Sequence, residues 1–214
     1  RRQRQMCIRD RSMSVWKDVD GILNADPKVF PDAVQIAELN YLDTIELAYS
    51  GAQIIHPKTI KPLQNKNIPL YVRPFGDKRK PGTVIRRMSA PIEVPILILK
   101  KDQVLLTIRS RDFSFVLEEK FAAIFSLLER YRIKVNLVHN SAVNLSLCVD
   151  NSWHIDEAIQ ALRNEEFDVM KVENMELLTI RGYNGDLMER YASGPEVFLL
   201  QRTQSTARIV RKNR

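Results

Sequence analysis

The sequence predicts two kinds of structure in succession: an α/β layer covered by helices, and then an α+β sandwich. Between Val34 and Ile85, short apolar strands alternate with amphipathic helices, which is typical of a sheet covered by helices. From Ile96 onward the expected order is β-α-β-β-α-β, the order of a split βαβ or ferredoxin-like sandwich. The chain has 214 residues, which is enough for one large or two small domains with cores of their own.

The first part begins with a segment that we expect to be irregular. Residues 13–33 place Asp, Gly, Asn and Pro between short apolar pairs, a pattern that predicts an ordered loop and turns. A strand is expected over Val34–Leu39. Asn40 then offers a helix N-cap, with Asp43 in the capping-box position, and Gly51 is expected to end this helix in a left-handed conformation.

A second helix and two strands complete the predicted layer. Pro57 suits the first position of a short helix, and residues 68–73, "IPLYVR", read as a buried strand with Pro69 near its start. The charged turn "PFGDKRKPGTVI" leads back to a last strand. After Met88, residues 89–95 are expected to be a linker.

Three acids of the irregular segment, Asp18, Asp20 and Asp26, are open to two interpretations. They can hold a divalent metal ion or cap turns, and their spacing favours capping. The D-x-D-G start at Asp18 does not fit an EF-hand, because the twelfth loop position is Val29 and not a Glu. We therefore predict no metal site from this sequence.

The second part contains the predicted sandwich. We expect two strands around a turn at "KKDQ", then a helix, two strands, a helix and a strand. In chain order these elements are Ile96–Leu99, Val104–Ile108, Leu117–Arg130, Ile133–Val138, Val143–Val149, Ile155–Leu162 and Phe167–Val172.

A short internal match suggests a duplicated module. The residues L-L-T-I-R occur at 105–109 and again at 177–181, followed by an expected helix at Leu187–Tyr191 and two strands. The match covers five residues, so chance similarity stays open. We predict domains at 13–88, 96–174 and 175–214, the last being a shortened second copy.

Composition and charge exclude several classes of protein. The chain is 44% hydrophobic and 28% charged, as in ordinary globular proteins, and has neither an apolar run of about 20 residues nor a signal peptide. We therefore expect a cytoplasmic protein without a membrane segment. Cys7 and Cys148 form no C-x-x-C pair, which fits a reducing compartment and argues against structural zinc.

The net charge of +7 comes from the two ends of the chain. Residues 1–11 carry five Arg and one Asp, and residues 207–214 carry four basic residues and no acid, so the body between them is close to neutral. No aromatic-plus-basic sheet motif accompanies these charges, so a nucleic-acid partner is not expected. Residues 1–12 have no hydrophobic period and resemble translated adapter DNA. We expect this tail to be non-native and the natural protein to continue upstream.

Three motifs resemble those of the aspartate kinase family. "VWKDVDGILNADPKV" is similar to its nucleotide loop T-D-V-x-G-x-x-x-x-D-P-R, and "ELAYSGAQIIHPKTI" to E-x-x-x-x-G-A-x-x-[LI]-H-P-x-[ST]. "NIPLYVRPFGDKRKPGTVI" resembles I-P-[VI]-x-[VI] followed by G-T-x-[IV]. The resemblance implies the C-terminal part of an amino-acid-kinase three-layer α/β fold. The region that follows resembles the paired ferredoxin-like ACT regulatory modules that end these enzymes.

The resemblance implies ATP as the cofactor, with Mg²⁺ in the full-length enzyme, and one wall of its site in this chain. The implied contacts depart from the usual family residues: Lys17 stands at the position of a Thr, Leu23 at that of a Tyr near adenine, Lys28 at that of an Arg, and Gln53 at that of a Lys. Asp18 matches the family's acid. Lys28 can serve as a point charge but lacks the guanidinium fork.

The implied reaction is ATP plus L-aspartate to ADP plus 4-phospho-L-aspartate, the first step toward lysine, threonine and methionine. Phosphoryl transfer needs glycines that hold phosphate and groups that neutralise charge. The family's K-F-G-G-[ST] and R-G-G-S-D segments supply them, and neither occurs here. We therefore expect no catalytic residues in this chain and an inactive fragment. The alternative is an amino-acid-binding ACT module that acts without catalysis.

The resemblance also implies an amino-acid effector, lysine or threonine, at a homodimer contact between ACT modules. Its implied contacts are Phe113, Ser114, Val135 and Asn136, although alternation along the strand also fits an inward, structural Val135. Lysine-sensing relatives tend to place acids at the positions of Asn136 and Ala142. Both are neutral here, so a lysine ammonium would lose charge-assisted partners.

Overall fold

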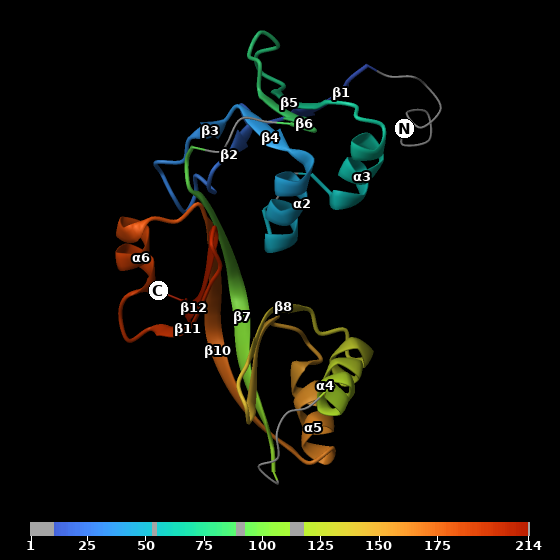
Figure 1. Ribbon diagram of the computed structural model, residues 1–214, viewed down its shortest axis with the longest axis vertical. Coiled ribbons are helices and arrows are strands. Elements are labelled where there is room, and N and C mark those ends of the chain that lie inside the picture. The colour runs from blue at the N-terminus through green and yellow to red at the C-terminus, as the bar shows by residue number, and fades with distance from the viewer. Residues whose placement is uncertain (1–10, 53–54, 89–92, 112–117, 214) are drawn as a thin grey trace. The chain divides into compact units, whose positions relative to one another are not determined.

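The computed structural model describes residues 11–52, 55–88, 93–111 and 118–213 (Figure 1). The chain divides into two compact units. The first is formed by the chain up to Leu99 together with Thr179–Tyr183, and the second by Lys100–Leu178 and Asn184–Arg214. No helix within the described ranges is long and apolar enough to cross a bilayer.

The first unit is built on a four-stranded mixed sheet with the order β1-β5-β6-β4. Strand β5 runs parallel to β1 and antiparallel to β6, and β4 runs parallel to β6. Strands β2 and β3 pair separately as an antiparallel ribbon. The bounds are β1 (Met13–Lys17), β2 (Ile22–Leu23), β3 (Gln35–Ile36), β4 (Glu38–Asn40), β5 (Leu70–Pro74) and β6 (Thr83–Arg86).

Two helices, α2 (Tyr41–Ser50) and α3 (Pro57–Asn65), confirm the predicted signals at their ends. The side-chain oxygen of Asn40 accepts a hydrogen bond from the backbone N–H of Asp43 at 2.7 Å. Gly51 follows α2 with φ 115°, a conformation that favours glycine. His56 caps α3, since its Nδ1 accepts from the backbone N–H of Lys58 at 3.1 Å.

The core of the first unit lies on the face of the sheet that α2 and α3 cover. Leu39, Ile60, Leu70, Val72 and Ile85 are each 0% exposed within it. The prediction of loops throughout residues 13–33 was wrong, because Met13–Lys17 forms β1. Its strand partner in the described sheet, β5, lies far along the chain, so pairing rather than local pattern makes these five residues a strand.

The second unit contains a six-stranded sheet with the order β11-β12-β10-β7-β9-β8. Helices α4 and α5 lie against the part formed by β7, β9 and β8 (Figure 1). The predicted β-α-β-β-α-β order is confirmed. The bounds are β7 (Ile96–Ser110), α4 (Glu118–Arg130), β8 (Val135–Asn140), β9 (Asn144–Asp150), α5 (Ile155–Asn164), β10 (Phe167–Arg181), α6 (Gly185–Ala192), β11 (Val197–Arg202) and β12 (Thr206–Lys212).

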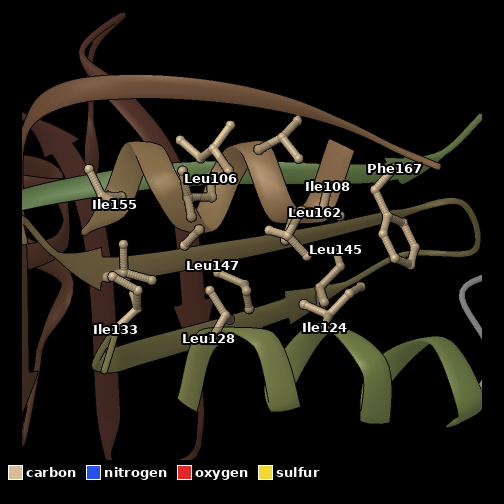
Figure 2. Packing of buried hydrophobic residues seen from close by; sticks show 14 of the residues in the cluster. Leu106, Ile108, Ile124, Leu128, Ile133, Leu145, Leu147, Ile155, Leu162 and Phe167 are labelled. Atoms are coloured by element: carbon tan, nitrogen blue, oxygen red, sulfur yellow. The ribbon is translucent and has the colours of Figure 1, made fainter. Parts of the chain in front are cut away.

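Apolar side chains fill both faces of this sheet. Between the sheet and the helices, Leu106 and Ile108 from β7 and Leu145 from β9 pack against Ile124 and Leu162 from α4 and α5 (Figure 2). A smaller cluster on the opposite face takes one or two residues from every strand. Its buried members are Leu105, Leu137, Cys148, Met175, Leu177, Leu199 and Val210.

The predicted turn at "KKDQ" was wrong, because β7 continues through it as one strand of 15 residues. Strand β10 likewise joins the two segments that we expected to be separate. Each strand contains one non-glycine residue in the left-handed region, Asp102 with φ 55° and Asn174 with φ 58°. Asp and Asn tolerate this conformation better than most residues, so a local irregularity replaces the expected break.

The two irregularities also support the predicted duplication, since Asp102 and Asn174 stand at the same position before the L-L-T-I-R match. Each copy runs strand, helix, strand, strand, and the final hairpins have equal strand lengths of six and seven residues. The carbonyls of Asp102 and Asn174 accept from the backbone N–H groups of Asn151 and Asn213, which occupy matching positions. Both hairpins also shift register at the same point, after Val135 and after Val197.

Candidate functional site

The carboxyl ends of β1 and β5 form one candidate site. In open α/β sheets, ligands bind outside the carboxyl ends of parallel strands. Lys17 is the last residue of β1, and its carbonyl accepts from the backbone N–H of Phe75, just after β5, at 2.7 Å. Asp18 follows in an exposed loop. Two of the predicted nucleotide contacts therefore lie at this edge of the sheet.

The loops after β1 and β5 are joined by a salt bridge. Nζ of Lys80 lies 2.6 Å from Oδ2 of Asp20, with both side chains about half exposed. The hydrogen bond that Lys80 donates to Asp20 raises the pKa of Lys80. Lys80 was not among the predicted contacts, because nothing in "GDKRKPG" distinguishes one cation from its neighbours before the loop is folded.

The buried hydroxyl group of Thr83 stabilises the loop at the same edge of the sheet. Thr83 is 0% exposed, and its Oγ1 accepts from the backbone N–H of Ile22 at 2.8 Å and donates to the carbonyl of Ile36 at 2.6 Å. A Cβ added to Gly21 would lie 2.7 Å from that hydroxyl. These contacts hold the start of β2 against β6 and leave little room for a side chain at position 21.

The remaining predicted nucleotide contacts lie farther along the chain. Leu23 is partly buried on β2, and Lys28 is exposed in the next turn, where its backbone N–H donates to Oδ1 of Asp26 at 2.9 Å. Asp26 thus caps a turn, as expected. Gln53 lies outside the described residues. Among the side chains that the structure describes, no three His, Cys, Asp or Glu residues are grouped so that they could hold a metal ion.

Arg73 is a second residue at this edge that the sequence did not single out. It lies near the end of β5 with its guanidinium 4.9 Å from the centre of the Tyr71 ring. Its Nε is buried and has no hydrogen-bond partner within the described residues. Arg73 therefore adds a cation close to the loops after β1 and β5, and the strand pattern alone could not show its orientation.

The second candidate site surrounds the start of β8. Val135 packs against the core between the sheet and its helices. Asn136 belongs to a polar cluster: its Oδ1 accepts from Nζ of Lys100, and its Nδ2 donates to Oε1 of Gln103 and Oδ1 of Asp150, each at 2.7 Å. The predicted effector residue Asn136 is thus held by three side chains. Phe113 and Ser114 lie outside the described residues.

The charges of this polar cluster are mutually compensated. Burial alone would raise the pKa of Asp150, but hydrogen bonds from Lys100, Gln103 and Asn136 outweigh it and hold that pKa below its usual value. Cys148 donates weakly to Oε1 of Gln103 at 3.6 Å, and burial raises the pKa of this thiol to about 12. The carboxylate is therefore ionised and the thiol neutral near pH 7.

The second copy of the repeat has no such cluster. The positions of Lys100, Gln103, Asn136 and Asp150 are taken there by Val172, Met175, Phe198 and Lys212. Both copies nevertheless form the same strands and hairpin. The polar cluster is therefore not a requirement of the fold, and it marks the first copy as the chemically distinct one.

Comparisons with known proteins agree on one family. Residues 7–74 match the Amino acid kinase family. The chain is 33% identical over 182 residues to aspartokinase 2, chloroplastic, of Arabidopsis thaliana, covering 80% of the chain and 32% of that protein. It is 31% identical over 194 residues to lysine-sensitive aspartokinase 3 of Escherichia coli K12, covering 87% and 42%. The chain thus spans about a third of the length of the first relative and about two fifths of the second.

A solved structure shows the same fold. E. coli aspartokinase III in complex with aspartate and ADP superposes with a TM-score of 0.78 at 23% identity, covering 94% of this chain and 49% of that one. The predicted fold class, the end of an amino-acid-kinase domain followed by ACT-like modules, is confirmed.

Proposed function

This chain belongs to the aspartokinase family, and on that premise we propose that it forms the C-terminal part of an ATP-dependent kinase that phosphorylates L-aspartate. The product would be 4-phospho-L-aspartate, which opens the route to lysine, threonine and methionine. The observation that carries this proposal is the edge formed by β1 and β5, where the family's nucleotide-loop motif follows a parallel strand.

The residues present fit part of a nucleotide site. Lys17, Lys28 and Arg73 offer positive charge toward phosphate, and Leu23 offers an apolar surface toward a base. ATP would supply the phosphoryl group, and these residues would bind and orient it. Asp18 would accept hydrogen bonds from donor groups of the ligand. No contact to Mg²⁺ or to the aspartate acceptor is proposed for the residues that the structure describes.

We propose that the first copy of the repeat senses an amino acid. Asn136 and its partners form a polar cluster that the second copy lacks, at the start of the strand implied by the resemblance. The ammonium group of Lys100 lies 2.7 Å from both Asn136 Oδ1 and Asp150 Oδ1. If the α-ammonium group of an effector displaced that of Lys100, these two oxygens would accept its hydrogen bonds. The other proposed effector contacts are Phe113, Ser114 and Val135. The proposed assembly is a homodimer of these modules.

An assay that couples ADP release to a change in absorbance tests the catalytic proposal. The full-length protein should release ADP only when both ATP and L-aspartate are present. We propose that the 214-residue chain alone shows no turnover and binds ATP with Kd above about 1 mM, which is less than about 4 kcal/mol of binding. ADP release by the full-length protein that does not depend on aspartate would contradict the proposed substrate.

The alternative function is that of an amino-acid-binding regulatory module without catalysis. The compact second unit, with two cores of its own, supports this alternative for the chain as given. The two functions differ in the assay above. Amino-acid binding by the chain, together with a full-length protein that never releases ADP, would favour the regulatory module.

A further inference from the structure

Asn24 lies directly after β2, within the nucleotide-loop motif of residues 15–29, and is only 8% exposed. Its backbone N–H donates to the carbonyl of Val34 at 2.9 Å, and its Oδ1 accepts from the backbone N–H of Val34 at 2.7 Å. Its Nδ2 donates to the carbonyl of Pro95 at 2.8 Å, and its own carbonyl accepts from the backbone N–H of Leu97 at 2.8 Å. Two of these bonds close the turn between β2 and β3, and two reach the start of β7.

Apolar packing reinforces the connection between this loop and β7. Ile22 of β2 and Ile36 of β3 belong to the same buried core as Ile96 and Ile98 of β7, all within the first unit. Removing the amide of Asn24 from such a buried contact would leave its partner groups unsatisfied, which costs more than the bond itself contributes. The side chain of Asn24 therefore fixes the end of the segment that we expected to be a linker.

The strand that Asn24 contacts continues to the polar cluster at Asn136. Strand β7 begins in the first unit and continues in the second as one element of 15 residues. Lys100 stands three residues after Leu97, which is about 10 Å along a strand. Its Nζ lies 2.7 Å from oxygens of both Asn136 and Asp150. Rigid elements and hydrogen bonds connected in this way can carry energetic coupling between two sites.

We propose that Asn24 is a positioning residue that couples the nucleotide loop to the polar cluster through β7. Leu23, the proposed contact to the base, directly precedes it, and Asp26, which caps the turn at Lys28, follows two residues later. An effector that displaced Lys100 would shift the start of β7, and the bonds of Asn24 would pass this shift to the loop. Such coupling is reciprocal, so a nucleotide would change the affinity for the effector by the same factor. The inference rests on the proposed function, which assigns the two ligands to these two places.

Hydrogen exchange of the 214-residue chain, followed by backbone amide NMR, tests this coupling without either ligand. Lys100→Val perturbs the polar cluster by introducing the residue that the second copy has at this position, Val172. We expect it to speed exchange in residues 22–29 about fivefold, as the loss of one hydrogen bond would. In the Asn24→Ala background, Lys100→Val should no longer change exchange there. The amides of α3, in the same unit, should respond in neither background.

Two further variants separate coupling from a general loss of structure. At neutral pH, Asn24→Asp keeps the oxygen that accepts from Val34 but lacks the donor to Pro95, so it should abolish the response to Lys100→Val as Asn24→Ala does. Gln35→Ala is the matched control in the same ribbon. It removes the exposed hydrogen bond from Gln35 Nε2 to the carbonyl of Asp20 and should leave the response intact.

The exchange rates in residues 22–29 decide the outcome. The inference is overturned if Lys100→Val leaves these rates unchanged in the natural chain, or changes them by the same factor in the natural chain and in Asn24→Ala. A merely structural role of Asn24 would raise the rates without altering the response to Lys100→Val. Absence of ADP release by the full-length protein would contradict the proposed function and leave the exchange result unaffected, so the two failures are distinguishable.

Discussion

Glu176 and Arg211 form a buried ion pair, with Oε1 and Nε 2.7 Å apart and side chains only 4% and 11% exposed. The first copy of the repeat has Val104 and Val149 at the same two positions, directly paired between β7 and β9. The Arg211 guanidinium also lies 5.6 Å from the centre of the Tyr191 ring on α6. One fold thus tolerates an apolar pair and an ionic pair at equivalent sites.

We predict that breaking this ion pair is costly but replacing it is not. Glu176→Gln or Arg211→Met should each lower the free energy of unfolding by about 3 kcal/mol, because one buried charge loses its partner. The double variant Glu176→Val/Arg211→Val copies the first module, and we expect it to be as stable as the natural chain or more so. Urea unfolding followed by circular dichroism measures all three.

The control is Lys80→Met, which removes one partner of the exposed Asp20–Lys80 pair and should leave the free energy of unfolding nearly unchanged, because solvent screens this pair. If the double valine variant lost as much stability as either single variant, the ion pair would be a specific requirement of the second copy.

Acid should weaken the second unit through Asp150. The pKa of this carboxyl is held below its usual value in the folded protein, so its contribution to stability is present above the ordinary pKa of about 3.9. That contribution is lost as the pH falls from there through the lower folded-state value. Asp150→Asn should lower the free energy of unfolding by about 1 to 2 kcal/mol near neutral pH. Below pH ~4, the free energy of unfolding of this variant should fall less steeply than that of the natural chain. If the free energy of unfolding of the natural chain and of Asp150→Asn fell in parallel with pH, this account would be contradicted.

Gly82 should be irreplaceable in the turn before β6. It has φ +72°, and an added Cβ would lie 2.0 Å from the carbonyl oxygen of Val72, a backbone atom that cannot move aside. Gly82→Ala should lower the free energy of unfolding by about 3 kcal/mol or more. Gly76→Ala in the same loop meets no atom within 4 Å and should change it by less than about 0.5 kcal/mol. Equal decreases in the free energy of unfolding for Gly82→Ala and Gly76→Ala, measured by urea unfolding, would contradict the steric argument.

Local signals in the sequence predicted much of the fold. The Asn40 cap, the Gly51 terminus and the β-α-β-β-α-β order each depend on neighbouring residues, and all three are confirmed. Strand β1 was missed because its partner β5 is distant in the chain. The continuity of β7 was missed because "KKDQ" is polar, whereas Asp102 takes the left-handed conformation without ending the strand.

The candidate sites were predicted less completely, for physical reasons. Motifs identified Lys17 and Asp18, but the burial of the Arg73 Nε and the pairing of Lys80 with Asp20 arise only when separate loops meet. Asn136 was identified by its place in the strand, yet its partner Lys100 lies in a segment expected to be a turn.

Amino-acid sensing by the first copy of the repeat is the central claim, and a thermal-shift series with lysine, threonine and methionine tests it most directly. We predict that lysine or threonine raises the Tm of the chain in a saturable way, and that Asn136→Ala abolishes this rise because the polar cluster loses its central amide. Phe198→Ala, the same position in the second copy, should leave the rise intact. Lysine stabilising both the natural chain and Asn136→Ala equally, or no amino acid stabilising either, would contradict the account.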